Sequence, residues 1–152
     1  MNKLDIDPKF PHYQVSSAIL GCCFDVMNTL GIGFLEPVYK KALCIALREE
    51  GLHVEMEKSF EVYFRKQNIG IYKADIVVEN LVIVELKCCK SLLPEHQAQV
   101  INYLAASNLP VGLLVNFTNK HLDYKRLHHP GEYPAAEGDP AHPVISKYFS
   151  EE

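Results

Sequence analysis

Two strongly apolar runs of the sequence contain or end at charged side chains that burial would disfavour. Residues 73–87 read KADIVVENLVIVELK, two aliphatic and β-branched runs separated by a Glu-Asn pair. Such runs are typical of strands that are covered on both faces. Asp75, Glu85 and Lys87 interrupt them, and burying an unpaired charge is costly. These three residues therefore indicate either a functional site or a structural ion pair.

The spacing of the charges predicts how they meet. If the loop at 79–81 closes a hairpin, with Asn80 in a left-handed conformation, Asp75 lies directly opposite Glu85. Their Cβ atoms would then be about 5 Å apart, a like-charge pairing that destabilises a sheet. Lys87 shares a strand face with Glu85 and supplies one positive charge.

A divalent metal would compensate the two carboxylates more fully. Mg²⁺ favours oxygen ligands and commonly binds one or two carboxylates together with waters and a phosphate. The alternative is that Lys87 and the carboxylates form an ion pair near the end of a sheet, with a purely structural role.

Length and composition predict a single soluble domain. The chain has 152 residues, of which 48% are hydrophobic and 22% charged, enough apolar content for a full core. It contains no apolar run of about 18 residues, and its polar start differs from a signal peptide, so we expect a cytoplasmic protein without membrane contact. The five cysteines are odd in number and lack C-x₂-C spacing, which predicts reduced, buried thiols.

The acidic charge is concentrated towards the C-terminal end. The net charge is −4, and residues 128–152 hold five acids against one base, so residues 1–127 are neutral. A neutral body is permissive for nucleic acid but lacks the basic face that usually marks a binder. The basic pairs at 40–41 and 65–66 are equally compatible with a solvated surface. The oligomeric state stays open, and a homodimer is compatible with the sequence.

Periodicity predicts the element order α–α–β–β–β–α–β. The predicted helices span about 12–30, 34–50 and 94–108, and the predicted strands span 53–65, 69–79, 81–88 and 111–117, with a further edge strand at 121–127. Turn-forming residues at 66–70 separate the first two strands. The residues expected to face inward include Leu35, Val38, Tyr39 and Leu43 on the second helix and Ala98, Ile101, Leu104 and Ala105 on the third.

The composition along the chain divides it into one folded domain and an extension. Residues 1–127 form the folded domain, which begins with a short arm, and residues 128–152 form a proline-rich acidic extension.

Three further residues lie on the predicted helices. Glu36 is in the first turn of the second helix, where the macrodipole favours a carboxylate, so a structural role is sufficient to explain it. The Gly-Ile-Gly segment before it could instead aim this helix start at the strands and add a third carboxylate. Gln99 and Tyr103 share a face of the third helix, either as ordinary partners or as site residues.

Several blocks together resemble a known family. The segment GFLEPVY at 33–39 matches the signature of the GxxExxY protein family, and ADIVVENLVIVELK, HQAQVINYL and VGLLVNF resemble its later blocks, in order, over residues 13–127. That family is similar to a branch of the PD-(D/E)XK nuclease-like superfamily. The resemblance implies an α/β (α+β) restriction-endonuclease-like core, with a mixed central sheet of about four to five strands flanked by helices.

The resemblance also implies a site. The residues that fall on the D…ExK, Q-x₃-Y and family glutamate positions are Asp75, Glu85, Lys87, Gln99, Tyr103 and Glu36. The expected ligands of Mg²⁺ or Mn²⁺ are Asp75, Glu85, the Leu86 carbonyl and Glu36. Ala74 replaces the proline that precedes the aspartate in the superfamily, and Ile32 and Met27 stand where the family often has proline and histidine.

These features lead to one expected function and two alternatives. The expected function is hydrolysis of a DNA or RNA backbone by a metal-activated water, with Lys87 orienting the water. One alternative is a non-catalytic module of the same fold that binds nucleic acid or protein, which the neutral body favours. The other is a hydrolase for a small phosphate ester, which a closed pocket would support.

Overall fold

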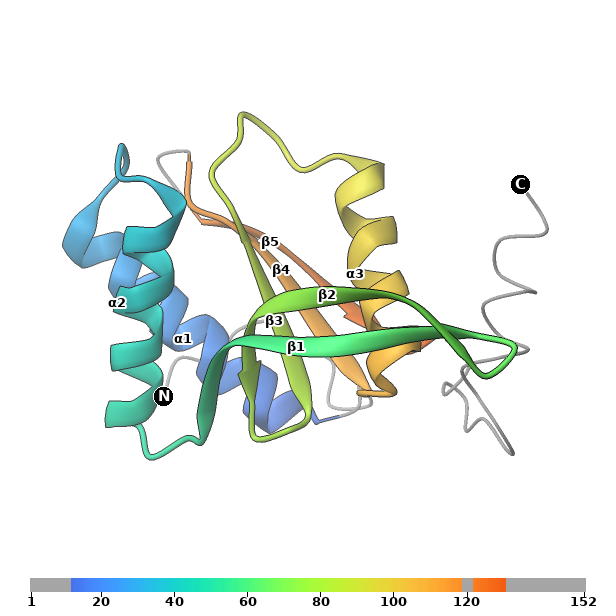
Figure 1. Cartoon of the computed structure of the whole chain (residues 1–152). Coiled ribbons are helices and arrows are strands. Elements are labelled where there is room, and N and C mark those ends of the chain that lie inside the picture. The colour runs from blue at the N-terminus through green and yellow to red at the C-terminus, as the bar shows by residue number, and fades with distance from the viewer. Residues whose placement is uncertain (1–11, 119–121, 131–152) are drawn as a thin grey trace.

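The fold contains helices and strands in the order α1–α2–β1–β2–β3–α3–β4–β5 (Figure 1). The computed structural model describes residues 12–118 and 122–130, so the N-terminal arm and most of the acidic extension lie outside the described residues. The elements are α1 (Tyr13–Leu30), α2 (Glu36–Glu49), β1 (Val54–Phe64), β2 (Gln67–Val78), β3 (Val82–Lys87), α3 (Pro94–Ser107), β4 (Val111–Asn116) and β5 (Asp123–His128).

The strands form one mixed sheet with the order β1-β2-β3-β4-β5. β3 and β4 are parallel, and each of the other neighbouring pairs is antiparallel. A parallel pair needs a crossover connection, and α3 provides it. The expected mixed sheet of four to five strands flanked by helices is thereby confirmed.

Helices cover both faces of the sheet (Figure 1). α1 and α2 pack on one face, in a core that includes Leu20, Leu43, Val84 and Val115. α3 packs on the other face through Val100 and Leu104. Every residue of β4 is buried, and so is all of β3 except its last residue. The long aliphatic runs of these strands therefore reflect burial on both sides.

The helices bury a narrower stripe than the sequence suggests. On α2, Tyr39, Leu43 and Leu47 are fully buried, whereas Leu35 and Val38 are 76% and 40% exposed, so the expectation that these two face inward is wrong. α2 begins at Glu36, which leaves Leu35 outside the helix as its N-cap residue. On α3 the buried residues are Val100, Leu104 and Ala105, while Ala98 and Ile101 are only partly buried.

A buried tyrosine holds the connection between α1 and α2. Gly31 and Gly33 have φ of 73° and 105°, a region that glycine adopts without steric penalty. The Tyr39 hydroxyl donates to the Gly31 carbonyl at 2.5 Å and accepts from the Phe34 N–H at 3.3 Å. Its ring stacks on Phe117, with centroids 4.8 Å apart. Tyr39 thus fixes the start of α2, where Glu36 lies.

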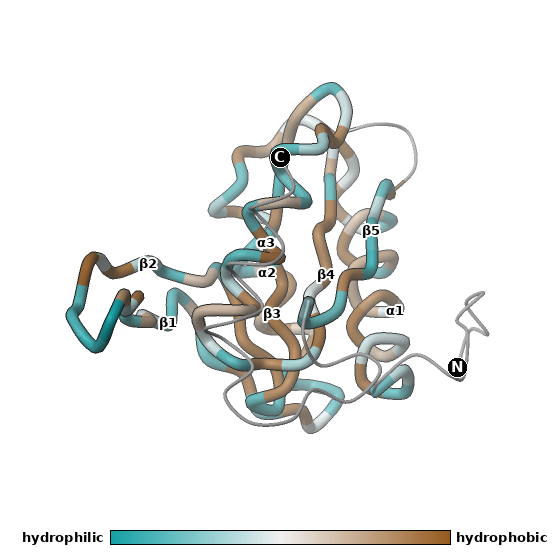
Figure 2. The backbone as a smooth tube through the Cα atoms, turned by 90° about the vertical axis from the view of Figure 1, so that its right-hand side faces the viewer, coloured by the Kyte–Doolittle hydropathy of each residue, from teal (hydrophilic) through white to brown (hydrophobic). Residues whose placement is uncertain are grey.

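The β1–β2 hairpin is long and turns at Arg65–Lys66, so the turn predicted at 66–70 comes too late in the sequence. Figure 2 shows this ribbon projecting from the rest of the molecule. β3 pairs with β2 only at Ile76, Val77 and Val78, which leaves the outer part of the ribbon without a third strand.

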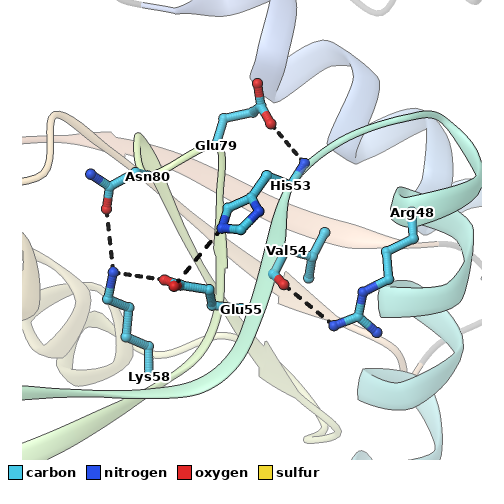
Figure 3. Close-up of polar contacts among 7 residues, drawn as sticks. All are labelled: Arg48, His53, Val54, Glu55, Lys58, Glu79 and Asn80. Carbon is cyan, nitrogen blue, oxygen red and sulfur yellow. Dashed lines mark hydrogen bonds and ion pairs between the residues drawn. The ribbon is translucent and has the colours of Figure 1, made fainter.

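Polar contacts fix the opposite end of the ribbon to its surroundings (Figure 3). The His53 N–H donates to Glu79 Oε2 at 2.7 Å, and Lys58 Nζ lies 2.6 Å from Glu55 Oε2 and 3.4 Å from Asn80 Oδ1. The β2–β3 turn is therefore tied to the start of β1.

The cysteines agree in part with the expectation of reduced, buried thiols. All five cysteines are free; Cys22, Cys23 and Cys44 are buried, while Cys88 and Cys89 are partly exposed. Among residues 12–118 and 122–130, the helices lack the length of apolar sequence that a bilayer-spanning segment needs.

Candidate active site

The two acidic residues of the β2–β3 hairpin lie together between their strands. The register pairs Ile76 with Val84 and Val78 with Val82, as a loop centred on Asn80 predicts. On the Asp75 side of the Ile76–Val84 pair, carboxylate side chains accept the hydrogen bonds from backbone N–H groups in place of backbone carbonyls. The Asp75 N–H donates to Glu85 Oε1 at 3.2 Å, and the Leu86 N–H donates to Asp75 Oδ2 at 2.9 Å.

A break in the strand pairing makes room for these carboxylates. The β1–β2 register pairs Met56 with Ile76 and Lys58 with Ala74, but the intervening pair of Glu57 and Asp75 is missing. Glu57 has a φ of 55°, outside the strand region. Ala74 packs in the core on the α3 side of the sheet, whereas Ile76 packs in the core on the α1 and α2 side. Residues two apart on a strand normally share a face. Asp75 therefore lies at the point where the alternation of side chains between the two faces of the sheet is interrupted along β2.

Glu85 is buried and lacks full charge compensation. It is 6% exposed. Burial, and next the neighbouring Asp75 carboxylate, raise the pKa of Glu85 to about 9, while the hydrogen bond from the Asp75 backbone and the charge of Lys87 act in the opposite direction. A carboxyl group in this state favours either a proton or a closely bound cation.

A lysine of α2 completes the surroundings of Asp75. Lys40 Nζ lies 3.4 Å from Asp75 Oδ1, and the two side chains are only 15% and 16% exposed. Burial, followed by the charge of Asp75, raises the pKa of Glu36, and Lys87 and Lys40 lower it. α2 therefore brings Glu36 and Lys40 to the charged end of β2 and β3.

The Leu86 carbonyl faces the same side as the carboxylates. The Leu86 N–H is directed at Asp75, and the N–H and C=O of one residue project to the same edge of a strand. The Lys87 carbonyl accepts from the Phe117 N–H at 2.9 Å, on the opposite edge. The backbone oxygen of Leu86 is thus placed on the Asp75 side of β3.

The two α3 residues are placed differently. The Tyr103 ring stacks on Tyr72, with centroids 3.9 Å apart, and its carbonyl accepts from the Tyr72 hydroxyl at 2.7 Å. Burial, followed by the charges of Glu85 and Asp75, raises the pKa of Tyr103, so this side chain belongs to the surroundings of the carboxylates. Gln99, one turn earlier, is exposed.

The sequence reasoning missed residues that hold the site in shape. Lys40 follows Glu36 at helical spacing, but its contact with Asp75 depends on how α2 docks. Asn116, fully buried at the end of β4, accepts from the Cys89 N–H at 3.0 Å and donates to the Cys89 carbonyl at 2.9 Å. The sequence did contain a signal for Asn116, because a polar amide at the end of an aliphatic strand must find hydrogen-bond partners when it is buried. Asn116 fixes the chain just after Lys87.

The donor set fits a hard divalent cation. Asp75, Glu85 and the Leu86 carbonyl are all oxygen donors, as Mg²⁺ and Mn²⁺ prefer, and Mg²⁺ commonly keeps several waters. In the part of the chain that the structure describes, no group of three or more His, Cys, Asp or Glu side chains is arranged to hold a metal ion. Side chains alone therefore supply two carboxylates, and backbone and water would complete the coordination.

Comparisons with known proteins agree with this geometry. The family model described as the PD-(D/E)XK nuclease superfamily matches residues 13–127. No curated protein shows significant similarity to the chain. The crystal structure of an alkaline exonuclease (LHK-Exo) from Laribacter hongkongensis is similar to this fold with a TM-score of 0.51 and 14% identity, covering 95% of this chain and 81% of that one.

A second solved structure matches a smaller part of the chain. The crystal structure of SSO0001 has a TM-score of 0.49 and 20% identity, over 62% of this chain, and the chain spans half of that protein's length. The mixed sheet with its flanking helices is the restriction-endonuclease-like fold expected from the sequence. By the match over residues 13–127, which contain the Asp75–Glu85 pair, the chain belongs to the PD-(D/E)XK nuclease superfamily.

Proposed function

We propose that this protein is a divalent-metal-dependent nuclease that hydrolyses the phosphodiester backbone of DNA or RNA. The observation that supports it most directly is the pair of Asp75 and Glu85, each of which accepts a hydrogen bond from a backbone N–H of the neighbouring strand where the β2–β3 ladder ends. A structural ion pair would not require strands to lose their pairing. Within the superfamily, the GFLEPVY segment at 33–39 supports membership of the GxxExxY family.

In this proposal the carboxylates and one carbonyl hold the metal. Asp75, Glu85 and the Leu86 carbonyl are the ligands of Mg²⁺ or Mn²⁺. Glu36, at the start of α2, is the further ligand expected from the sequence, and it has to move closer to act as one, because it does not form a three-carboxylate group with the other two in the described residues. When bound, the ion supplies positive charge to a non-bridging phosphate oxygen and makes a water more acidic.

In this proposal Lys87 orients the attacking water and helps to pass its proton towards solvent. As the new bond to phosphorus forms, the P–O bond opposite it breaks, and its oxygen leaves with one product strand. The positive charge of Lys87 lowers the pKa of both Glu36 and Glu85, which supports a role for this lysine beside these carboxylates. Tyr103 holds the phosphate or Lys87 from the α3 side. Gln99 has the same role in the proposal, and because it is exposed, substrate must approach along α3 for it to act.

A cleavage assay tests the activity. The protein is incubated with labelled single- and double-stranded DNA and RNA, with a small phosphodiester, and with Mg²⁺, Mn²⁺ or EDTA. We expect metal-dependent cleavage of a polynucleotide, and Lys87→Ala should lower the rate by about 10²–10⁴-fold. Binding without cleavage by the unmodified protein would instead indicate a silent binding module. Cleavage of the small ester alone would indicate a small-molecule hydrolase.

Calorimetry tests the division of labour between the residues. Lys87→Ala should keep Mg²⁺ binding, since the lysine is not a ligand, whereas Asp75→Asn should weaken it. Loss of metal binding in Lys87→Ala, or unchanged affinity in Asp75→Asn, would contradict these roles.

A further inference from the structure

The outer part of the β1–β2 hairpin, residues 58–73, is called the arm from here on; it is a different segment from the short N-terminal arm. Its base packs beside α3, and Figure 2 shows its tip extending away from the helices and from the other strands. Two-stranded ribbons are marginally stable by themselves. Four large apolar side chains of the arm are nevertheless more than half exposed, namely Tyr63, Phe64, Ile69 and Ile71 at 57%, 53%, 63% and 65%. An exposed group of this kind indicates a surface that meets a partner.

The arm is also positively charged. Residues 59–73 contain Arg65, Lys66 and Lys73 but a single acid, Glu61, which accepts a hydrogen bond from the Tyr63 hydroxyl. The Arg65 guanidinium lies over the Phe64 ring, 4.9 Å from its centroid. A flat cation stacked on an aromatic ring beside free apolar side chains suits a polyanion that also has apolar faces.

The tip carries its charges in an unfavourable conformation. Arg65 and Lys66 have φ of 48° and 65°, the pattern of a type I′ turn, for which Asn-Gly is strongly preferred. Bulky side chains are uncommon in this region. The sequence therefore places two adjacent cations at the outermost point of the arm, although local backbone preference disfavours them there.

The arm leads directly to the carboxylates. Phe60 stacks on Tyr72, which stacks on Tyr103 of α3, so the base of the arm is fixed beside the site. β2 continues from the tip to Asp75 in one strand. Gln67 and Asp75 are eight positions apart, and eight strand rises span about 26 Å, the length of about eight base pairs of a duplex.

We propose that the arm binds duplex DNA on one side of the cleaved phosphodiester, with Arg65 and Lys66 on phosphates about eight base pairs away. This rests on the proposed nuclease function. A contact at such a distance requires a stiff substrate, which favours a duplex over a single strand. The major groove of B-DNA admits a two-stranded ribbon, whereas that of A-form RNA is too narrow. The arm carries an excess of positive charge, which repels the arm of a second copy and attracts a polyanion, so charge favours DNA over a second copy.

The test uses a variant that should preserve the turn. Arg65→Asn combined with Lys66→Gly installs the preferred type I′ pair and removes both charges, so its melting temperature should be unchanged or higher. Binding is measured by fluorescence anisotropy in a Lys87→Ala background, on a 20-base-pair DNA duplex and a 6-base-pair DNA hairpin. The matched control, Lys41→Ala with Lys125→Ala, removes two exposed lysines outside the arm.

We expect the tip variant to lose up to about 60-fold in affinity for the long duplex at 0.1 M salt. Its plot of log affinity against log salt should be less steep by about 2, because two phosphate contacts are lost. The 6-base-pair hairpin and the lysine control should show little change. Unchanged affinity and salt dependence for the long duplex would overturn the proposal, as would equal arm dependence for an RNA duplex.

Further outcomes distinguish DNA binding by the arm from dimerisation through the arm, and separate it from the proposed nuclease function. A dimer in sedimentation velocity that becomes a monomer in the tip variant, with DNA affinity unchanged, would assign the arm to a second copy and overturn DNA binding. Because binding is measured without cleavage, arm-dependent binding by a protein that cleaves nothing would support the arm and refute the nuclease. Cleavage of every duplex at the same rate by the unmodified protein and the tip variant would support the nuclease and refute the role of the arm.

Discussion

Asp75 and Glu85 show how backbone groups can hold two carboxylates side by side. Each accepts an N–H from the opposite strand, and Lys40 gives Asp75 an ionic partner. Glu85 has no such partner at hydrogen-bond distance in the described residues, and the burial that shields it from water raises its pKa. The residue whose ionisation is least favourable is therefore the one that a bound cation would help most.

This imbalance predicts a pH dependence of stability without metal. The pKa of Glu85 in the folded state is raised from 4.5 to about 9, so the folded protein binds more protons than the unfolded chain between these values. Stability from this group is fully present below the lower value and is lost as pH rises through the higher one. In EDTA, the melting temperature should fall more between pH 5 and pH 9 for the unmodified protein than for Glu85→Gln. Parallel profiles for the two proteins would contradict the expectation.

Lys40 predicts a second effect at the residue scale. Its ammonium, 3.4 Å from Asp75, repels a metal ion that approaches the same carboxylate. Lys40→Gln should therefore bind Mg²⁺ about two- to fivefold more tightly, the range of a partly exposed ion pair. Titration calorimetry measures the change, and Lys41→Gln, on an exposed neighbour, should leave the affinity as it is. Weaker Mg²⁺ binding by Lys40→Gln would argue that the lysine orders Asp75 for the metal.

Among the elements, α3 approaches the sheet at a glycine. A Cβ on Gly112 of β4 would lie 2.6 Å from Val100 Cγ1 and 3.3 Å from Leu104 Cδ1, both on α3. The absence of a side chain there lets α3 pack close to the sheet. Because Tyr103 belongs to the same helix, this close approach also sets its distance from the carboxylates.

Gly112→Ala should accordingly displace α3 and lower the free energy of unfolding by about 1–3 kcal/mol, as overpacking in a core does. Urea unfolding measures the loss. The matched control is Gly21→Ala in α1, where an added Cβ meets no atom within 4 Å. That change should stabilise the protein by about 0.5–1 kcal/mol, because alanine favours the helix. Equal effects at both positions would mean that α3 does not depend on the glycine.

For the molecule as a whole, metal binding should be linked to folding. The proposed ligands Asp75 and Glu85 come from two strands that meet only in the folded chain, so a metal ion held by them would bind the native state selectively. At a concentration of 100 times its Kd, Mg²⁺ should raise the free energy of unfolding by about 2.7 kcal/mol. Thermal unfolding with and without EDTA measures this, and Asp75→Asn should lose the effect while Lys87→Ala keeps it. Equal stabilisation of Asp75→Asn would place the ion elsewhere.

Local chemistry explains what the sequence predicted well. The β2–β3 register depends on a short turn at Glu79 and Asn80, with φ of 54° and 52°, so the opposition of Asp75 and Glu85 follows from residues close to them. The buried runs of β3 and β4 were equally clear, because strands covered on both faces are continuously apolar.

Features set by long-range packing were not predictable. The Lys40–Asp75 contact joins residues 35 apart and needs α2 to dock against the strands. The turn at Arg65 and Lys66 was missed because Asn68 and Gly70 are stronger turn signals than a pair of bulky cations. The exposure of Gln99 likewise depends on which stripe of α3 faces the sheet.

The irregularity at Glu57 has a consequence for the behaviour of the protein in concentrated solution. β1 is the edge of the sheet, and an open edge can template the addition of strands from other molecules. The left-handed residue interrupts that edge, and the charged side chains of Glu55, Lys58 and Glu61 on either side of it discourage pairing with another strand. The same kink that releases Asp75 from the ladder thus also guards against aggregation, so a substitution that straightens β1 would close the site and make the edge adhesive.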